Sequence, residues 1–187
     1  MIMDTVTLIG INLYGKRLIR KVKIDQEVVF LSLHQLSALD LAPLAQCTKL
    51  KGIYLDSNNL LEIDLAPLAQ CTQLQTLDLH NNKLIEVDLT PLVNLKDLKG
   101  LGFDSSVKLL LSRDVQNKEL PPALEMRRTE INWTEPRDLI KQLRQVSLSC
   151  ETLSLAELTE LLNFQNTSTL KKWLLKEAVG KVAFKSN

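Results

Sequence analysis

Apolar and polar positions alternate along residues 26–97 in a pattern that repeats every 24 positions. Three units align without insertions, and the nine residues DLAPLAQCT occur identically at 40–48 and 64–72. Six alignment columns are apolar in all three units: Val29, Ile53 and Leu77; Leu31, Leu55 and Leu79; Leu36, Leu60 and Leu84; Leu39, Ile63 and Val87; Leu41, Leu65 and Leu89; Leu44, Leu68 and Leu92. One unit cannot bury these side chains alone, whereas stacked units bury each column as a continuous ladder. The pattern therefore predicts stacked repeats, with a fourth unit that begins at residue 98 and then decays.

The second and third units follow the motif LxxLxLxxNxL, with Ile at one position of the second unit. The motif is most complete in the third unit, at Leu74, Leu77, Leu79, Asn82 and Leu84. It resembles the motif of the leucine-rich repeat family, and the resemblance covers residues 26–104. The resemblance implies a short parallel strand from each unit on a concave face and a return along the convex side. The proline of each DLAPL or DLTPL segment restricts this return to a short helical turn or an extended segment.

Polar residues and cysteines occupy their own columns in the repeat. Asn58 and Asn82 follow the expected strands, and an Asn side chain can satisfy both donors and acceptors of the inward-pointing turn backbone. His34 stands in the same column of the first unit and is expected to take the same role. Cys47 and Cys71 share a column with a leucine of the third unit, so we expect small buried core residues. Neighbouring strands lie about 5 Å apart, which leaves a disulfide between them open.

Strand alternation predicts which side chains point away from the core. With Val29 and Leu31 inward, the residues between and after such positions point outward in every unit. We predict that the outward set binds a protein or peptide; it consists of Phe30, Ser32, Tyr54, Asp56, Asp78, His80 and Asp104. Two exposed aromatic rings edged by carboxylates suit a partner with apolar and basic groups. The alternative is a surface that serves only the stability of the repeat.

The two ends of the repeat need covers, because open sheet edges attract other strands. Residues 1–25 are assigned to an N-terminal cap, in which the alternation around Tyr14-Gly15 predicts a β-hairpin over 5–25. The basic residues of this hairpin either meet an anionic partner or form a solvated strand face; they are Lys16, Arg17, Arg20, Lys21 and Lys23. Residues 105–135 are assigned to a C-terminal cap or linker, with the domain ending at Pro121-Pro122. The sequence does not decide whether this segment is a rigid cap or a hinge.

Residues 136–187 have a helical pattern. A helix is expected over 136–146, a second begins at the capping box of Ser154 and Glu157, and a third precedes a strand over 181–185. This order resembles a winged helix of the PCI-domain and ESCRT-II type, which uses the fold to bind proteins. Arg, Asn and Gln, the usual base-reading residues, are absent from the third helix. That helix would expose three candidate contacts to nucleic acid or to a protein partner: Lys171, Lys172 and Lys176.

Composition narrows the classes of function. The chain holds 23 basic and 22 acidic residues, so it lacks the basic surplus typical of proteins that neutralise nucleic-acid phosphates. Its three cysteines form no dense framework, which indicates a reducing compartment. No signal-peptide pattern is present, and no apolar run approaches the ~20 residues that span a bilayer. We therefore expect a soluble cytoplasmic protein.

The sequence contains no motif for catalysis, a metal or a cofactor. GxSxG, HExxH, a phosphate-binding loop and a dinucleotide fingerprint are all missing. We predict a protein that is not an enzyme, with no cofactor and no metal. The expected fold class is α/β (α+β): a short leucine-rich repeat solenoid over 26–104 with an N-terminal hairpin cap, followed by a small helical winged-helix-like domain over 136–187.

The predicted function is that of an adaptor. It would bind a protein or peptide on the concave face of the repeats, and the winged helix would be a second docking module. One alternative is a nucleic-acid-associated regulator that uses the winged helix for backbone contacts. Another is an accessory subunit of an enzyme complex. The identity of the partner, the pathway, the oligomeric state and the completeness of the chain stay open.

Overall fold

The computed structural model describes residues 4–134. The chain divides into two compact units, residues 1–134 and 135–187. The winged-helix-like domain expected over 136–187, with Lys171, Lys172 and Lys176, lies outside the described residues.

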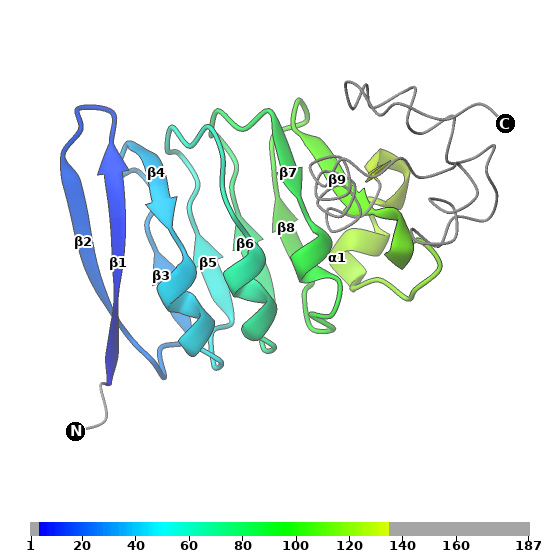
Figure 1. Ribbon diagram of the computed structural model, residues 1–187, viewed down its shortest axis with the longest axis horizontal. Coiled ribbons are helices and arrows are strands. Elements are labelled where there is room, and N and C mark those ends of the chain that lie inside the picture. The colour runs from blue at the N-terminus through cyan, green and yellow to red at the C-terminus, as the bar shows by residue number, and fades with distance from the viewer. Residues whose placement is uncertain (1–3, 135–187) are drawn as a thin grey trace, which may run out of the picture. The chain divides into compact units, whose positions relative to one another are not determined.

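The regular structure of residues 4–134 consists mainly of short strands joined by tight turns (Figure 1). The strands are β1 (Thr5–Asn12), β2 (Arg17–Lys23), β3 (Val28–Phe30), β4 (Leu36–Asp40), β5 (Gly52–Tyr54), β6 (Thr76–Asp78), β7 (Glu86–Asp88), β8 (Gly100–Gly102), β9 (Lys108–Ser112) and β10 (Asn132–Thr134). The helices of residues 4–134 are α1 (Pro122–Glu125) and the 3-10 helices η1 (Ala42–Gln46), η2 (Ala66–Gln70), η3 (Thr90–Leu92), η4 (Arg113–Val115) and η5 (Arg128–Glu130). All of them are too short to cross a membrane.

A four-stranded parallel sheet, in the order β3-β5-β6-β8, carries the repeat. Each strand pairs with the next at a shift of 24 residues, so that Val29, Ile53, Leu77 and Leu101 stand side by side. Figure 1 shows these strands in chain order, from blue to green. The structure therefore contains the strand interval that the sequence pattern predicts.

The apolar columns fill the space behind this sheet. Five of the six columns are buried in all three units, and the column of Leu39, Ile63 and Val87 is half-buried in the first two. Burial of each leucine side chain contributes about 1.5–3 kcal/mol to the free energy of folding. The ladder is therefore the main source of stability. The core consequently extends from unit to unit instead of closing within one.

Cys47 and Cys71 are free thiols within this core, as predicted from their shared column. The thiol of Cys71 donates to the carbonyl oxygen of Leu44 at 3.3 Å. Burial raises the pKa of both thiols, and it raises that of Cys71 to about 11 with a smaller contribution from Cys47. Both side chains therefore act as small protonated core residues at neutral pH.

The return segments contain 3-10 turns. η1, η2 and η3 each carry a proline in their first turn, and an aspartate before each turn accepts a backbone N–H. For example, Asp64 Oδ1 accepts from the N–H of Ala66 at 2.9 Å. The next strand begins soon after each turn, since η2 ends at Gln70 and β6 begins at Thr76, which leaves no room for a longer helix.

The fold-class prediction, α/β (α+β) with a solenoid followed by a helical winged-helix-like domain, is wrong. The regular secondary structure of residues 4–134 consists mostly of strands in three sheets, and the single α-helix of these residues, α1, has four residues. The helical content that the prediction assigned to the class came from 136–187, outside the described residues. The helical segments of the repeats are only 3-10 turns, because the next strand begins too soon after each turn for a longer helix.

The N-terminal residues form a hairpin that joins the repeat. β1 and β2 pair antiparallel around a turn in which Gly15 has a φ of 72°, and β4 of the first unit pairs antiparallel with the other side of β1. Val6, Leu8 and Val22 are buried and extend the core. The hairpin thus covers the first 24-residue repeat, because β2 and β1 form one sheet with β4, which belongs to the return segment of that repeat.

The fourth unit continues further than the sequence pattern indicates. β9 pairs parallel with β7, and β10 pairs parallel with β9. In the third repeat, ten positions separate Leu77 on β6 from Val87 on β7. In the fourth repeat, only eight positions separate the corresponding residues, Leu101 on β8 and Leu109 on β9. This shorter loop shifts the later apolar residues out of the 24-residue alignment, which explains the apparent decay.

The segment 105–134 belongs to the same packed unit. Val107, Leu109, Leu111 and Val115 are buried, and burial continues after Pro121-Pro122, where we expected the domain to end. The later buried residues are Ala123, Leu124 and Ile131. Pro122 instead begins α1, in agreement with the preference for proline at the first helical position.

Asn58 and Asn82 join successive units at the turn after each strand, as predicted. Asn58 Nδ2 donates to the carbonyl oxygens of Leu31 at 2.8 Å and Leu55 at 2.9 Å, and its Oδ1 accepts the N–H of Leu36 at 3.0 Å. Asn82 repeats the pattern one unit later, from the carbonyls of Leu55 and Leu79 to the N–H of Leu60. These amides satisfy buried backbone groups that water cannot reach.

His34 takes only part of this role. It is exposed, and its Nδ1 lies 2.7 Å from the carbonyl oxygen of Ser32. The adjacent column has a left-handed backbone in all three units, with φ of 63° at Leu33, 57° at Ser57 and 53° at Asn81. Leu adopts this conformation with strain, so the first unit depends on Asn58, which accepts the N–H of His34 at 3.1 Å.

We predict that Asn58→Ala lowers the free energy of unfolding by about 1–3 kcal/mol, because it orphans buried backbone donors and acceptors. Chemical denaturation of both proteins measures this loss. Asn59→Ala is the matched control: the N–H of Asn59 donates to Leu36 O, and alanine keeps that bond. Equal stability of the two variants would show that the Asn58 amide does not hold the units together.

Candidate functional site

The outward side chains of β3, β5, β6 and β8, with the residues that follow them, form one surface. We call it the strand face and define it by Phe30, Ser32, Tyr54, Asp56, Asp78, His80 and Asp104. Strand register places Phe30, Tyr54, Asp78 and Gly102 in one row across the sheet. Their inward neighbours are the buried ladder, so the alternation of the strands fixes which residues the face presents.

Two aromatic rings form a platform at one end of the strand face. Phe30 and Tyr54 stack with ring centroids 5.0 Å apart and an interplanar angle of 13°. Phe30 is 61% exposed, and Tyr54 is half-buried. Gly52 makes room for the tyrosine, since a Cβ at this position would lie 3.2 Å from Tyr54 Cε2. The platform is therefore held in place by its neighbours while one ring stays largely in solvent.

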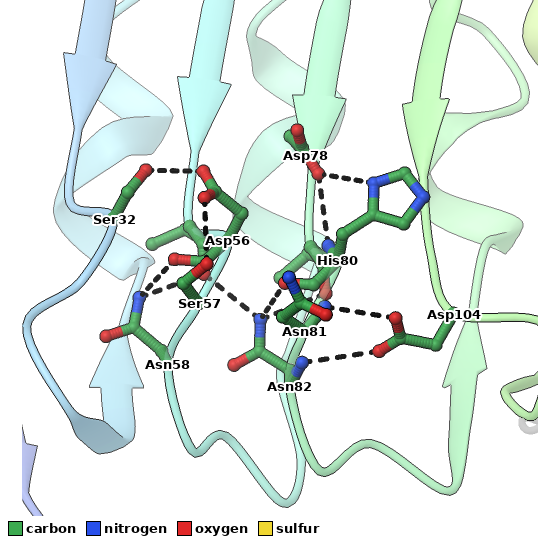
Figure 2. Close-up of polar contacts among 11 residues, drawn as sticks. Ser32, Asp56, Ser57, Asn58, Asp78, His80, Asn81, Asn82 and Asp104 are labelled. Carbon is green, nitrogen blue, oxygen red and sulfur yellow. Dashed lines mark hydrogen bonds and ion pairs between the residues drawn. The ribbon is translucent and has the colours of Figure 1, made fainter.

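Asp56 lies beside the platform and accepts two hydroxyl hydrogen bonds (Figure 2). Ser32, one unit earlier, donates to Oδ1, and Ser57 donates to Oδ2 at 3.2 Å. Both donors are neutral, so the negative charge of the carboxylate is not cancelled by a neighbouring cation. The side chain is only partly buried and can still meet a ligand.

Asp78 and His80 form a pair on the next strand (Figure 2). Asp78 Oδ1 accepts the backbone N–H of His80 at 3.0 Å and lies 2.9 Å from His80 Nδ1. The pair occupies the space over Gly102, where a Cβ would come within 2.5 Å of both Asp78 Oδ1 and His80 Nδ1. The glycine of the fourth unit thus permits the side chains of the third to lie flat across the sheet.

Asp104 has a different environment. Its two oxygens accept the backbone N–H groups of Asn81 at 3.1 Å and Asn82 at 3.3 Å. Figure 2 shows this carboxylate at the turn that follows β6, apart from the Asp78–His80 pair. Asp104 consequently stabilises the Asn turn as well as adding negative charge to the strand face.

The described part of the chain places no nucleophile beside His80 and no metal-ligand group on the strand face. Among residues 4–134, no Ser, Thr or Cys side chain hydrogen-bonds to His80, and the carboxylate that orients it is Asp78 and not Asp56 or Asp104. The same stretch holds no group of three or more His, Cys, Asp or Glu side chains that suits a metal ion. The prominent features of the strand face are an aromatic platform and, next to it, carboxylates that bond to hydroxyls, backbone N–H groups and one histidine.

Sequence reasoning placed the seven residues of the strand face on one surface, and the structure brings them together in four groups: the Phe30–Tyr54 stack, the Ser32–Asp56 pair, the Asp78–His80 pair, and Asp104 at the Asn turn. It did not include Ser57, which donates to Asp56, and it gave no role to Gly102, which makes room for His80. The signal for Gly102 was present in the alignment, since it stands in the column of Phe30, Tyr54 and Asp78. The signal for Ser57 was absent, because its contact depends on a left-handed turn.

In comparisons with known proteins, no family model matches the chain, and no curated protein and no solved structure resembles it significantly.

We predict that Gly102→Ala displaces the Asp78–His80 pair without unfolding the protein. The clashing atoms are the ends of exposed side chains, so stability should change by less than about 1 kcal/mol. The ring resonances of His80 in NMR spectra should shift clearly. Gly100→Ala is the control, because its Cβ would meet only Thr76, at 3.2 Å. An unmoved His80 signal in Gly102→Ala would contradict the described packing.

Proposed function

We propose that the compact unit of residues 1–134 is a non-catalytic protein-binding module and that its ligand lies across the strand face. The ligand is a protein segment with an apolar side chain for the Phe30–Tyr54 platform and a basic side chain for the adjacent carboxylates. The chain would act as an adaptor. The resemblance to the leucine-rich repeat family and a cytoplasmic location stay predictions, the latter supported by the free thiols of Cys47 and Cys71.

The exposure of Phe30 is the observation that carries this proposal. A large aromatic ring that is 61% exposed has no role in the ladder behind it, since its two neighbours along the chain, Val29 and Leu31, are the side chains that point inward and are buried. Stacking on Tyr54 holds the ring in a fixed position, which lowers the entropy lost on binding. Aromatic side chains in such positions supply much of the binding energy of protein interfaces.

The carboxylates define the charge of the ligand. Asp56 and Asp78 flank the platform, and no Lys or Arg among the described residues forms an ion pair with either. A basic side chain of a ligand can contact an aromatic face by a cation–π interaction and reach a carboxylate with its charged end. Complementary charge of this kind selects partners and speeds association more than it tightens binding.

The two alternative functions have less support. The strand face is acidic and would repel the phosphates of nucleic acid, so a nucleic-acid-associated regulator would depend on Lys171, Lys172 and Lys176, outside the described residues. An accessory subunit of an enzyme complex would use the strand face in the same way as an adaptor. It differs only in the identity of the partner.

Selection of a random peptide library on the full chain tests the proposal. We expect enriched peptides in which an aromatic or aliphatic residue lies within a few positions of Lys or Arg. Their affinity should fall roughly 30-fold in the double variant Phe30→Ala with Tyr54→Ala, because truncating an interface anchor costs about 2 kcal/mol. Asp56→Asn should weaken binding less and reduce its dependence on salt.

The matched control is Ile85→Ala, which removes a side chain that is 77% exposed but lies in a loop outside the sheet. It should bind the selected peptides as the native chain does. Full affinity in the aromatic double variant, or equal losses in the double variant and in the control, would refute a specific site on the strand face.

A further inference from the structure

A second surface lies at the free edge of β2, and it is basic whereas the strand face is acidic. Among the described residues, β2 pairs only with β1, and Figure 1 shows it as the outermost strand at the blue end of the chain. β2 and the turn before it hold five basic residues and no acidic one: Lys16, Arg17, Arg20, Lys21 and Lys23. We propose that this edge binds an acidic, extended segment of a partner protein as an additional antiparallel strand.

The register of the hairpin decides which backbone groups are free. The N–H of Ile24 donates to Asp4 O and that of Asn12 donates to Lys16 O, each at 3.0 Å. In an antiparallel ladder such bonded pairs alternate with non-bonded ones, so Leu18, Arg20 and Val22 direct their backbone groups to β1. The residues between them direct theirs to the open edge.

Three residues of that edge have unused backbone groups. The N–H of Lys23 lies 3.4 Å from Gln26 Oε1, and its carbonyl accepts the N–H of Gln26, so the turn occupies this position. Arg17, Ile19 and Lys21 have no backbone partner on the edge side among residues 4–134. They offer alternating donors and acceptors to an incoming strand, which is the basis of recognition by strand addition.

The side chains on this edge specify the charge of the incoming strand. Arg17, Arg20 and Lys21 are exposed, and none forms an ion pair with a described residue. Their cross-strand neighbours on β1 are uncharged: Ile11 faces Arg17, Leu8 faces Arg20 and Thr7 faces Lys21. An acidic neighbouring strand would therefore be the first to balance these charges.

Charged side chains on an open edge can serve only to prevent aggregation, and that role would explain the basic residues of β2 but not Ile19. This side chain is 64% exposed in the middle of the free edge, and it stands opposite Ile9, which is 37% exposed. An apolar residue of an added strand would extend this outward row. The positions facing Lys21, Arg20, Ile19, Leu18 and Arg17 thus call for the order acidic, acidic, apolar, apolar, acidic.

A second copy of this chain is a poor occupant. Antiparallel pairing of two β2 edges centred on Ile19 places Arg17 of one copy against Lys21 of the other, on both sides of the centre. Like charges directly opposite one another destabilise a strand pair. The same charges favour a partner of opposite sign, so the edge distinguishes a foreign acidic strand from its own copy.

The test uses a fluorescent acetylated peptide with Glu-Glu-Ile-Val-Glu at its centre, added to the full 187-residue chain at low salt. We expect saturable binding in fluorescence anisotropy. A peptide of the same sequence with methylated backbone nitrogens at the first, third and fifth of these residues should bind at least tenfold more weakly. It keeps the charges but loses the hydrogen bonds to the edge.

Ile19→Pro is the decisive variant. It removes an N–H that points to the open edge and none that bonds to β1, so the hairpin can form while strand addition is blocked. We expect at least a tenfold loss of peptide affinity, against a two- to threefold loss in the matched variant Ile19→Ala. Circular dichroism checks that both variants fold.

If Ile19→Pro does not fold, the combined variant Arg17→Glu, Arg20→Glu and Lys21→Glu replaces it. That variant should lose the acidic peptide and bind its counterpart with Lys-Lys-Ile-Val-Lys. Equal binding of the methylated peptide would mean mere attraction to a basic surface and would overturn the proposal. So would the absence of saturable binding, or dimerisation of the chain alone that Ile19→Pro abolishes.

Discussion

The pairing of successive strands at a constant 24-residue step is the constraint on which the rest of the structure depends. It aligns Val29, Ile53 and Leu77 into one buried row and, by the alternation of strands, aligns Phe30, Tyr54 and Asp78 into one outward row. A shift of one residue would exchange the two rows and put aspartate into the core. Asn58 and Asn82 fix this step, because each bonds to backbone groups of its own unit and of the unit before it.

The stacked core also explains why one molecule can present two unlike surfaces. Each unit buries its apolar side chains against its neighbours, so the strand face contributes little to the core. The hairpin covers the first unit with Val6, Leu8 and Val22 and leaves the far edge of β2 open. One surface is aromatic and acidic, the other basic with an apolar centre. The two therefore suit ligands of opposite charge.

The sequence predicted those features that depend on repetition. The apolar columns, the interval between the strands, the two asparagines and the outward position of Phe30 all follow from a pattern seen three times. Features that depend on one local geometry were missed. The loop of the fourth unit is two residues shorter, so Leu109 and Leu111 fell outside the alignment, and the residues of β9 and β10 were assigned to the C-terminal cap or linker over 105–135 instead of to the repeat. The α/β (α+β) class was wrong because residues 4–134 form three sheets with one four-residue α-helix, while the helices that the prediction relied on were assigned to 136–187, outside the described residues.

Amide hydrogen exchange in the full chain tests the constant strand step most directly. The N–H groups of Leu31, Leu55 and Leu79 donate to Tyr54, Asp78 and Gly102 of the following strands, at 2.8, 2.8 and 2.9 Å. If units stack as described, these three amides exchange only when the whole unit unfolds, and all three at a similar rate. Exchange of any of them at the rate of an unstructured peptide would contradict the stacking and, with it, the strand face that the stacking creates.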